Sequence, residues 1–160
     1  MTDHSKLFAF IAKCESPADL KEMIRKARLQ NESTLADAAF DRLITIAPAA
    51  NPGTLEHDFW RTVAAFEQLR TEYNGKTTLL SRTRQKVAKV GEQALLAEWA
   101  RSKPTTGFRM LLDMGRPDLT GEAIVLRHPQ CFSEAERASA ADRLEAEKVD
   151  LASILEAGAA

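Results

Sequence analysis

Long apolar runs, aromatic residues and a strong net charge are all lacking in this sequence of 160 residues. No window approaches the roughly 18 consecutive apolar residues of a membrane-spanning helix, and the N-terminus lacks the basic region and apolar run of a signal peptide. Aromatic residues make up 6% of the chain, and the formal net charge is −1. We therefore expect an ordinary globular protein of the cytoplasm that has no contact with membranes.

Cysteine and histidine are also scarce. The two cysteines, Cys14 and Cys131, lie far apart and form no C-x-x-C pattern, so we expect reduced thiols. The three histidines, His4, His57 and His128, show no spacing typical of metal ligands, so we expect no metal and no cofactor. His128 is close in sequence to Cys131, but a histidine there is more often a cation at a helix C-terminus. We expect no catalytic residues and no enzyme activity.

Apolar residues recur at helical spacing along most of the chain, and no segment shows the period-two alternation of a strand. The longest predicted helix covers residues 55–73 and ends at Asn74-Gly75. The sequence therefore predicts an all-α fold, a compact domain of about eight helices with helical hairpins and a long central helix. Signals for helix starts occur at Ser16, at Ser33 or Thr34, and at Thr54, Thr105, Thr120 and Ser133.

A single helical domain over residues 1–160 is the simplest division of a chain this long. Residues 1–75 are expected to form an N-terminal helical layer together with the long helix. Residues 76–150 are expected to form a basic module of small helices and a C-terminal helix. Residues 151–160 are expected to be frayed, because apolar support there is thin.

Charge is distributed unevenly along the chain. Residues 1–75 carry 9 Lys and Arg against 11 Asp and Glu, residues 76–109 carry 8 against 2, and residues 110–160 carry 5 against 10. The stretch 76–90 holds five cations and no acid. A nucleic-acid site needs positive charge only where it binds, so a basic segment between two acidic ones is compatible with such a site even though the net charge of the chain is near zero.

One helical face within this stretch carries the strongest candidates. Arg82, Lys86 and Lys89 fall at i, i+4 and i+7 with Gln85 beside them, among hydroxyl-bearing residues that commonly bind phosphate. Because phosphate contacts provide affinity but no sequence information, we predict weakly specific binding of DNA or RNA. The expected contact residues are Lys76, Arg82, Arg84, Gln85, Lys86, Lys89, Arg101, Lys103 and Arg109.

Other interpretations remain open at this point. Three short helices over residues 80–115 have the size of a helix-turn-helix unit, although residues 107–115 offer only Arg109 for reading bases. The basic stretch is equally compatible with a solvated surface or with an intramolecular partner for the acidic C-terminal third. The alternative function is a protein-interaction module that uses the N-terminal hairpin or an exposed groove beside the long helix. A sparse leucine seam (Leu144, Leu151 and Leu155) leaves the oligomeric state open.

Overall fold

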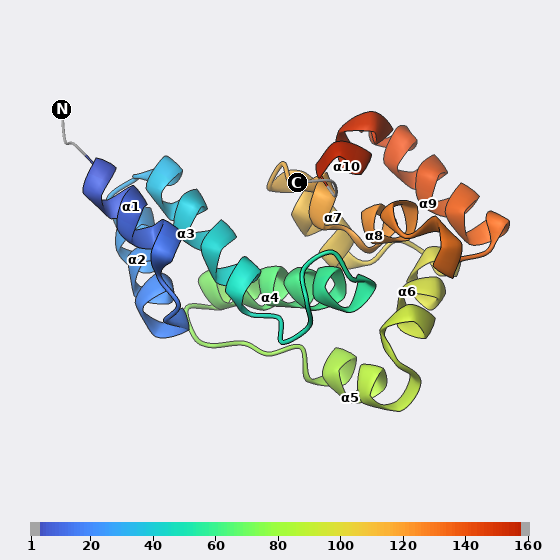
Figure 1. Ribbon diagram of the computed structural model, residues 1–160, viewed down its shortest axis with the longest axis horizontal. Helices are drawn as coiled ribbons and strands as arrows, with labels where there is room; N and C mark the ends of the chain where they lie inside the picture. The colour runs from blue at the N-terminus through green and yellow to red at the C-terminus, as the bar shows by residue number, and fades with distance from the viewer. Residues whose placement is uncertain (1–3, 158–160) are drawn as a thin grey trace.

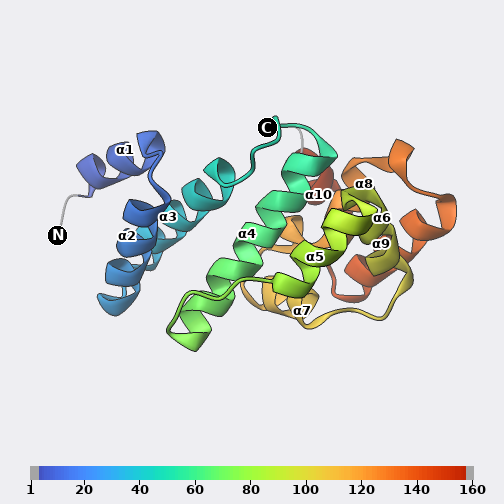
Figure 2. The ribbon, with the colours of Figure 1, turned by 90° about the horizontal axis from the view of Figure 1, so that it is seen from below.

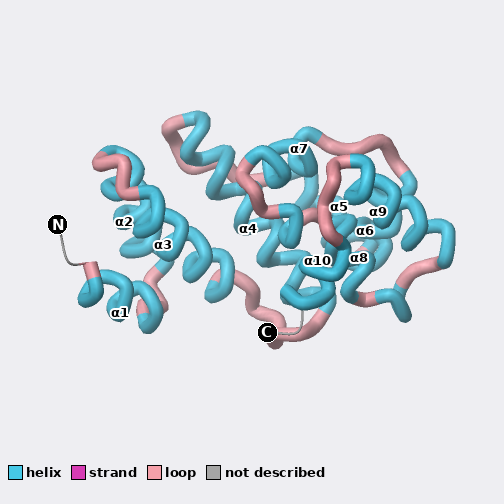
Figure 3. The backbone as a smooth tube through the Cα atoms, turned by 90° about the horizontal axis from the view of Figure 1, so that it is seen from above, coloured by secondary structure: helices cyan, strands magenta, loops and turns pink. Residues whose placement is uncertain are grey.

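The computed structural model describes residues 4–157, and the elements in that range are all helical, as Figure 3 shows. The prediction of an all-α fold is confirmed, with ten α-helices in the described range where about eight were expected. The α-helices are α1 (Ser5–Lys13), α2 (Pro17–Leu29), α3 (Ser33–Ile46), α4 (Leu55–Asn74), α5 (Ser81–Val90), α6 (Glu92–Arg101), α7 (Thr106–Asp113), α8 (Gly121–Arg127), α9 (Glu134–Ala146) and α10 (Leu151–Ala157). Two 3-10 helices, η1 (Pro117–Leu119) and η2 (Pro129–Cys131), flank α8.

Three helices, α1, α2 and α3, form a layer at the N-terminal end of the molecule (Figure 1). The start of α2 is the predicted one, because the Ser16 hydroxyl oxygen accepts the Asp19 N–H at 3.2 Å and Pro17 is the first helical residue. α2 and α3 pack as a hairpin. The small buried Ala36 allows the two helices to approach closely, and the ring of Phe40 is buried in the same cluster. α1 covers the other side of α3.

α4 lies between this layer and the C-terminal helices, as Figure 2 shows. It begins where the Thr54 hydroxyl oxygen accepts the His57 N–H, and it ends at Gly75, whose φ of 73° is left-handed. One face of α4 places Phe66 in a core that the N-terminal layer shares with Leu111 of α7 and Leu119 of η1. Phe59 lies on the same face two turns earlier and enters a second core with α6 and α8. The long central helix is therefore confirmed, and it joins two cores.

The C-terminal helices pack around α8, which contacts α6 and α9. The ring of Phe59 stacks on Trp99 of α6, with ring centroids 5.6 Å apart. The predicted caps at Thr105, Thr120 and Ser133 are confirmed, because each hydroxyl oxygen accepts a backbone N–H at the start of its helix. α5 lies at the edge of the molecule, packed against α6 (Figure 1).

Two local expectations in the first half of the chain and in α5 are wrong. Neither Ser33 nor Thr34 caps α3, because Glu32 occupies the N-cap position and its side chain makes no capping hydrogen bond. Val90 lies three residues after Val87, a spacing that predicts a place in the core, but it is 48% exposed. α5 is covered along one side only, the side that buries Val87.

The C-terminal end also differs from the expectation. Residues 151–157 form α10 instead of a frayed tail, while residues 158–160 lie outside the described part of the chain. The reason is packing: Ile154 is 1% exposed and lies in a small cluster with Phe108 and Leu144, against which Leu151 also packs. Leu151 and Ile154 are three residues apart, so a short helical signal was present in the sequence.

Gly107 marks the closest approach of α7 to the Phe66 ring of α4. A Cβ atom at this position would lie 2.6 Å from two ring atoms of Phe66. We expect Gly107→Ala to lower the free energy of unfolding by about 1–3 kcal/mol, although alanine favours helices, because overpacking outweighs helix propensity. Urea unfolding followed by circular dichroism measures the change, with the exposed Thr106→Ala as control. A stabilised Gly107→Ala variant would mean that the Phe66 ring moves into the adjoining 290 Å³ cavity.

Candidate functional site

The segment that follows α4 turns back along that helix before α5 begins (Figure 1). The Thr78 N–H donates to the Thr71 hydroxyl oxygen at 3.0 Å. The Leu80 N–H donates to Glu67 Oε2 at 2.8 Å. These two bonds hold residues 76–80 alongside the C-terminal half of α4 and fix the position at which α5 starts.

Arg84 of α5 donates to the same carboxylate. Its Nε lies 2.8 Å from Glu67 Oε2 and its Nη2 lies 2.7 Å from Glu67 Oε1, so the pair is bidentate. The guanidinium carbon lies 5.3 Å from the ring centroid of Trp60. The hydrogen bonds with Glu67, which is 8% exposed, raise the pKa of Arg84. Arg84 therefore fixes α5 to α4 and is not free to meet a ligand.

Leu80, Arg84 and Val87 are spaced at i, i+4 and i+7, and we call them the inner face of α5. The opposite side carries Arg82, Gln85, Lys86 and Lys89, which are all exposed, and we call these the outer face. Lys86 forms an exposed ion pair with Glu98 of α6. Within residues 4–157 the other three side chains have no hydrogen bond or ion pair. The predicted basic face is thus brought together, without Arg84.

The remaining predicted contact residues lie outside α5 and differ in their surroundings. Arg101 pairs with Glu136 at 2.7 Å, and Arg109 forms a bidentate pair with Glu147. Both acids belong to the C-terminal third, so the acidic segment does neutralise part of the basic one. Lys76 and Lys103 are exposed and have no ion pair in the described part of the chain.

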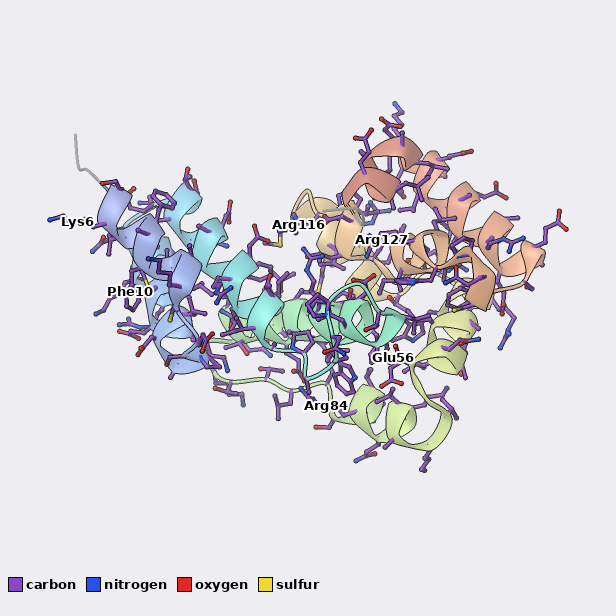
Figure 4. The ribbon with its side chains drawn as sticks, viewed as in Figure 1. Lys6, Phe10, Glu56, Arg84, Arg116 and Arg127 are labelled. Atoms are coloured by element: carbon purple, nitrogen blue, oxygen red, sulfur yellow. The ribbon has the colours of Figure 1, made fainter. Side chains whose placement is uncertain are left out.

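A group of charged side chains gathers around Asp58 of α4, whose place in the first turn would by itself indicate only a favourable charge at a helix N-terminus. Asp58 Oδ2 lies 2.8 Å from His128 Nε2 and 3.5 Å from the Nε of the buried Arg127. Asp118 is paired with Arg116 at 3.0 Å. Figure 4 shows Arg116 and Arg127 above α4, with Glu56 and Arg84 below it. No local signal predicts these pairs, because Asp58 and His128 are 70 residues apart.

Burial and ion pairing shift the pKa values of this group in opposite directions. For Asp118, burial favours the neutral carboxyl, but the hydrogen bonds and charge of Arg116 outweigh it and lower the pKa. For Arg127, burial dominates and lowers the pKa of the guanidinium despite the nearby Asp58. The geometry is that of a set of structural ion pairs that join α4 to η1 and to the end of α8.

A groove of about 720 Å³ runs beside α4. Its walls come from α4, from residues 47–50 after α3 and from residues 77–79 before α5. Glu56, Trp60, Ala64 and Gln68 follow one another at four-residue intervals along α4 and all line it. A groove beside the long helix is one of the two surfaces named above for the alternative function, the other being the N-terminal hairpin.

No protein-family model, curated protein or solved structure matches this chain. Among the described helices, none is long and apolar enough to cross a membrane. The part of the chain that the structure describes contains no group of three or more His, Cys, Asp or Glu side chains placed to hold a metal ion. The α5 outer face and the groove are therefore the two candidate functional surfaces of this chain.

The Glu67–Arg84 pair and the Lys86–Glu98 pair provide a matched comparison, because each joins α5 to a neighbouring helix. We expect Glu67→Gln to lower the free energy of unfolding by about 2 kcal/mol, since a buried charged hydrogen-bond acceptor is lost. We expect Glu98→Gln to cost less than about 1 kcal/mol, since that pair is exposed. Urea unfolding measures both, and amide hydrogen exchange of α5 should accelerate in Glu67→Gln alone. Equal effects of the two substitutions would contradict a special role for Glu67.

The lowered pKa of Asp118 predicts a pH dependence of stability. A carboxyl whose pKa is lower in the folded state stabilises the fold above its unfolded pKa of about 3.9 and loses that contribution as the pH falls further. We therefore expect Asp118→Asn to be less stable than the natural chain at pH 6, with a smaller difference at pH 3. Urea unfolding at both pH values measures this, with the exposed Asp142→Asn as control for the substitution itself. A difference that grows as the pH falls would contradict the assignment.

Proposed function

We propose that this chain binds nucleic acid through the outer face of α5, with affinity from phosphate contacts and little sequence specificity. One observation carries the proposal: α5 is fixed to α4 by its inner face, and Arg82, Gln85, Lys86 and Lys89 are exposed together on the opposite side. A regular helix keeps such side chains within reach of successive phosphates.

The electrostatic surroundings of this face support the proposal. No acidic residue occurs between Glu72 and Glu92. Lys86 does pair with Glu98, but side chains of an exposed pair exchange partners easily, because such pairs contribute only about 0–1 kcal/mol. Lys76, in the segment before α5, and Lys103, in the segment after α6, are two further exposed cations. A phosphate backbone on the outer face would therefore meet little competition from carboxylates.

The proposed contact set is smaller than the one expected from the sequence. Arg84, Arg101 and Arg109 are left out, because each donates to a carboxylate that is less exposed than Glu98, the partner of Lys86. Arg109 was the candidate for base reading on α7, so no helix-turn-helix recognition is part of the proposal. The contacts that remain do not distinguish DNA from RNA, and they favour weak specificity. The free thiols of Cys14 and Cys131 fit the cytoplasmic location that we propose with it.

Salt dependence tests the proposal directly. We expect short labelled DNA and RNA to bind in fluorescence polarisation at 50 mM salt and to bind more weakly at 200 mM. Three cations on phosphates predict a loss of about 20-fold for single strands and about 40-fold for duplex DNA over this range. We expect the Arg82→Ala, Lys86→Ala, Lys89→Ala triple variant to lose binding while its circular dichroism spectrum stays that of the natural chain.

A second triple variant controls for net charge. Lys6→Ala, Lys13→Ala and Lys26→Ala remove the same number of cations from α1 and α2, at the N-terminal end, where Figure 4 shows Lys6 pointing outward. This variant should bind as the natural chain does. The proposal is wrong if no probe binds at 50 mM salt, or if the two triple variants lose affinity equally.

A further inference from the structure

The groove beside α4 contains a polar atom that lacks a partner. Gln68 lines the groove and is 6% exposed, and no group in the described part of the chain donates a hydrogen bond to its side-chain oxygen, Oε1. A buried acceptor without a donor costs about 1–3 kcal/mol. Native proteins rarely leave such an atom unsatisfied, so Gln68 Oε1 is available to a donor from outside this chain.

The orientation of the Gln68 amide is set by its neighbours. Its Nε2 donates to Glu72 Oε2 at 3.4 Å. Glu72 Oε1 in turn accepts from Arg28 Nε at 2.9 Å, so the carboxylate cannot turn away. Exchanging the amide oxygen and nitrogen would place two acceptors against each other, and Oε1 therefore faces away from Glu72.

The other end of the groove is acidic. Glu56 lies one helical turn before Trp60, and the Trp60 indole N–H donates to Glu92 Oε1 at 3.1 Å, which brings Glu92 to the same end. Glu67 and Arg84 also line the groove, but they neutralise each other. Lys21 is the remaining cation of the lining. The acidic end thus has a net negative charge and favours a cationic group.

The lining between these two ends is mostly apolar. It includes Trp60 and Ala64 of α4, Leu79 of the segment before α5, and Leu43, Ala47 and Pro48 from the end of α3 and the residues after it. From Glu56 to Gln68 the helix rises by about 18 Å, at about 1.5 Å per residue. A fully extended peptide of five or six residues covers this length. An extended occupant presents backbone N–H groups along its whole length, whereas a helical one has free N–H groups only in its first turn.

We infer that this groove binds an extended segment of a partner protein. A Lys or Arg of that segment lies beside Glu56 and Glu92, its apolar side chains lie over Trp60 and Ala64, and one of its backbone N–H groups donates to Gln68 Oε1. The inference is independent of nucleic-acid binding, because the groove is acidic where the outer face of α5 is basic.

Selection from a library of random seven-residue peptides displayed on phage tests this inference on the intact chain. We expect enriched sequences to combine a Lys or Arg at one end with apolar residues beyond it. A synthetic copy of an enriched peptide, labelled for fluorescence polarisation, should bind about tenfold more weakly to the Glu56→Gln, Glu92→Gln double variant. It should also bind about tenfold more weakly to Gln68→Met, which keeps the side-chain volume but removes the acceptor.

Controls separate these effects from damage to the fold. The double variant Glu134→Gln, Glu145→Gln removes two exposed acids of α9 and should bind the peptide as the natural chain does. Thermal unfolding by circular dichroism should be similar for the two double variants and the natural chain, because Glu56 is exposed and a glutamine at position 92 can still accept from the Trp60 indole. Gln68→Met also loses the long 3.4 Å bond to Glu72, so its melting temperature should fall only slightly.

Several results would overturn the inference. They are the absence of any enriched sequence, enrichment of peptides without a cation, and equal binding by the groove variants and the α9 control. Sedimentation gives a further outcome: a dimer of the natural chain that dissociates in Glu56→Gln, Glu92→Gln would assign the groove to a second copy of this chain instead of a partner.

Discussion

The carboxylate of Glu67 is the interaction on which both candidate surfaces depend. It accepts three hydrogen bonds, one from the Leu80 N–H and two from the Arg84 guanidinium. Arginine suits this position because its planar fork matches a carboxylate and its face lies over Trp60, neither of which lysine reproduces. The pair decides how α5 is turned, and therefore which cations are exposed, and it also forms part of the groove wall.

α4 connects the parts of the whole molecule, as Glu67 connects α5 to α4. Its sides serve different purposes: one apolar side carries Phe59 and Phe66 into two cores, Glu67 holds α5, and Asp58 receives His128 and Arg127. Contacts with so many neighbours cover more of the helix than its apolar stripe. For this reason the buried residues of α4 include charged and polar ones, which are tolerated because they are paired. Gln68 Oε1 is the exception along this helix, and that makes it informative about a ligand.

The features that the sequence predicted correctly are those with a local cause. The helix caps at Ser16, Thr54 and Ser133 depend on residues within one turn, and the outer face of α5 follows from helical spacing alone. The role of Arg84 was missed because its partner lies 17 residues away, although its position between Leu80 and Val87 at helical spacing was a usable sign of an inner face. The ion pair of Asp58 with His128 gave no comparable sign, since it arises only from packing.

The ion pairs also explain why a chain with a net charge of −1 can still present a basic surface. Of the eight cations in residues 76–109, Arg84, Lys86, Arg101 and Arg109 are paired with carboxylates. The unpaired ones are therefore few, and those on α5 lie along one side. Counterion release scales with the number of phosphates neutralised, so under the proposed function a surface of this size predicts modest affinity and a salt dependence set by about three phosphates. The proposal needs no base-reading helix.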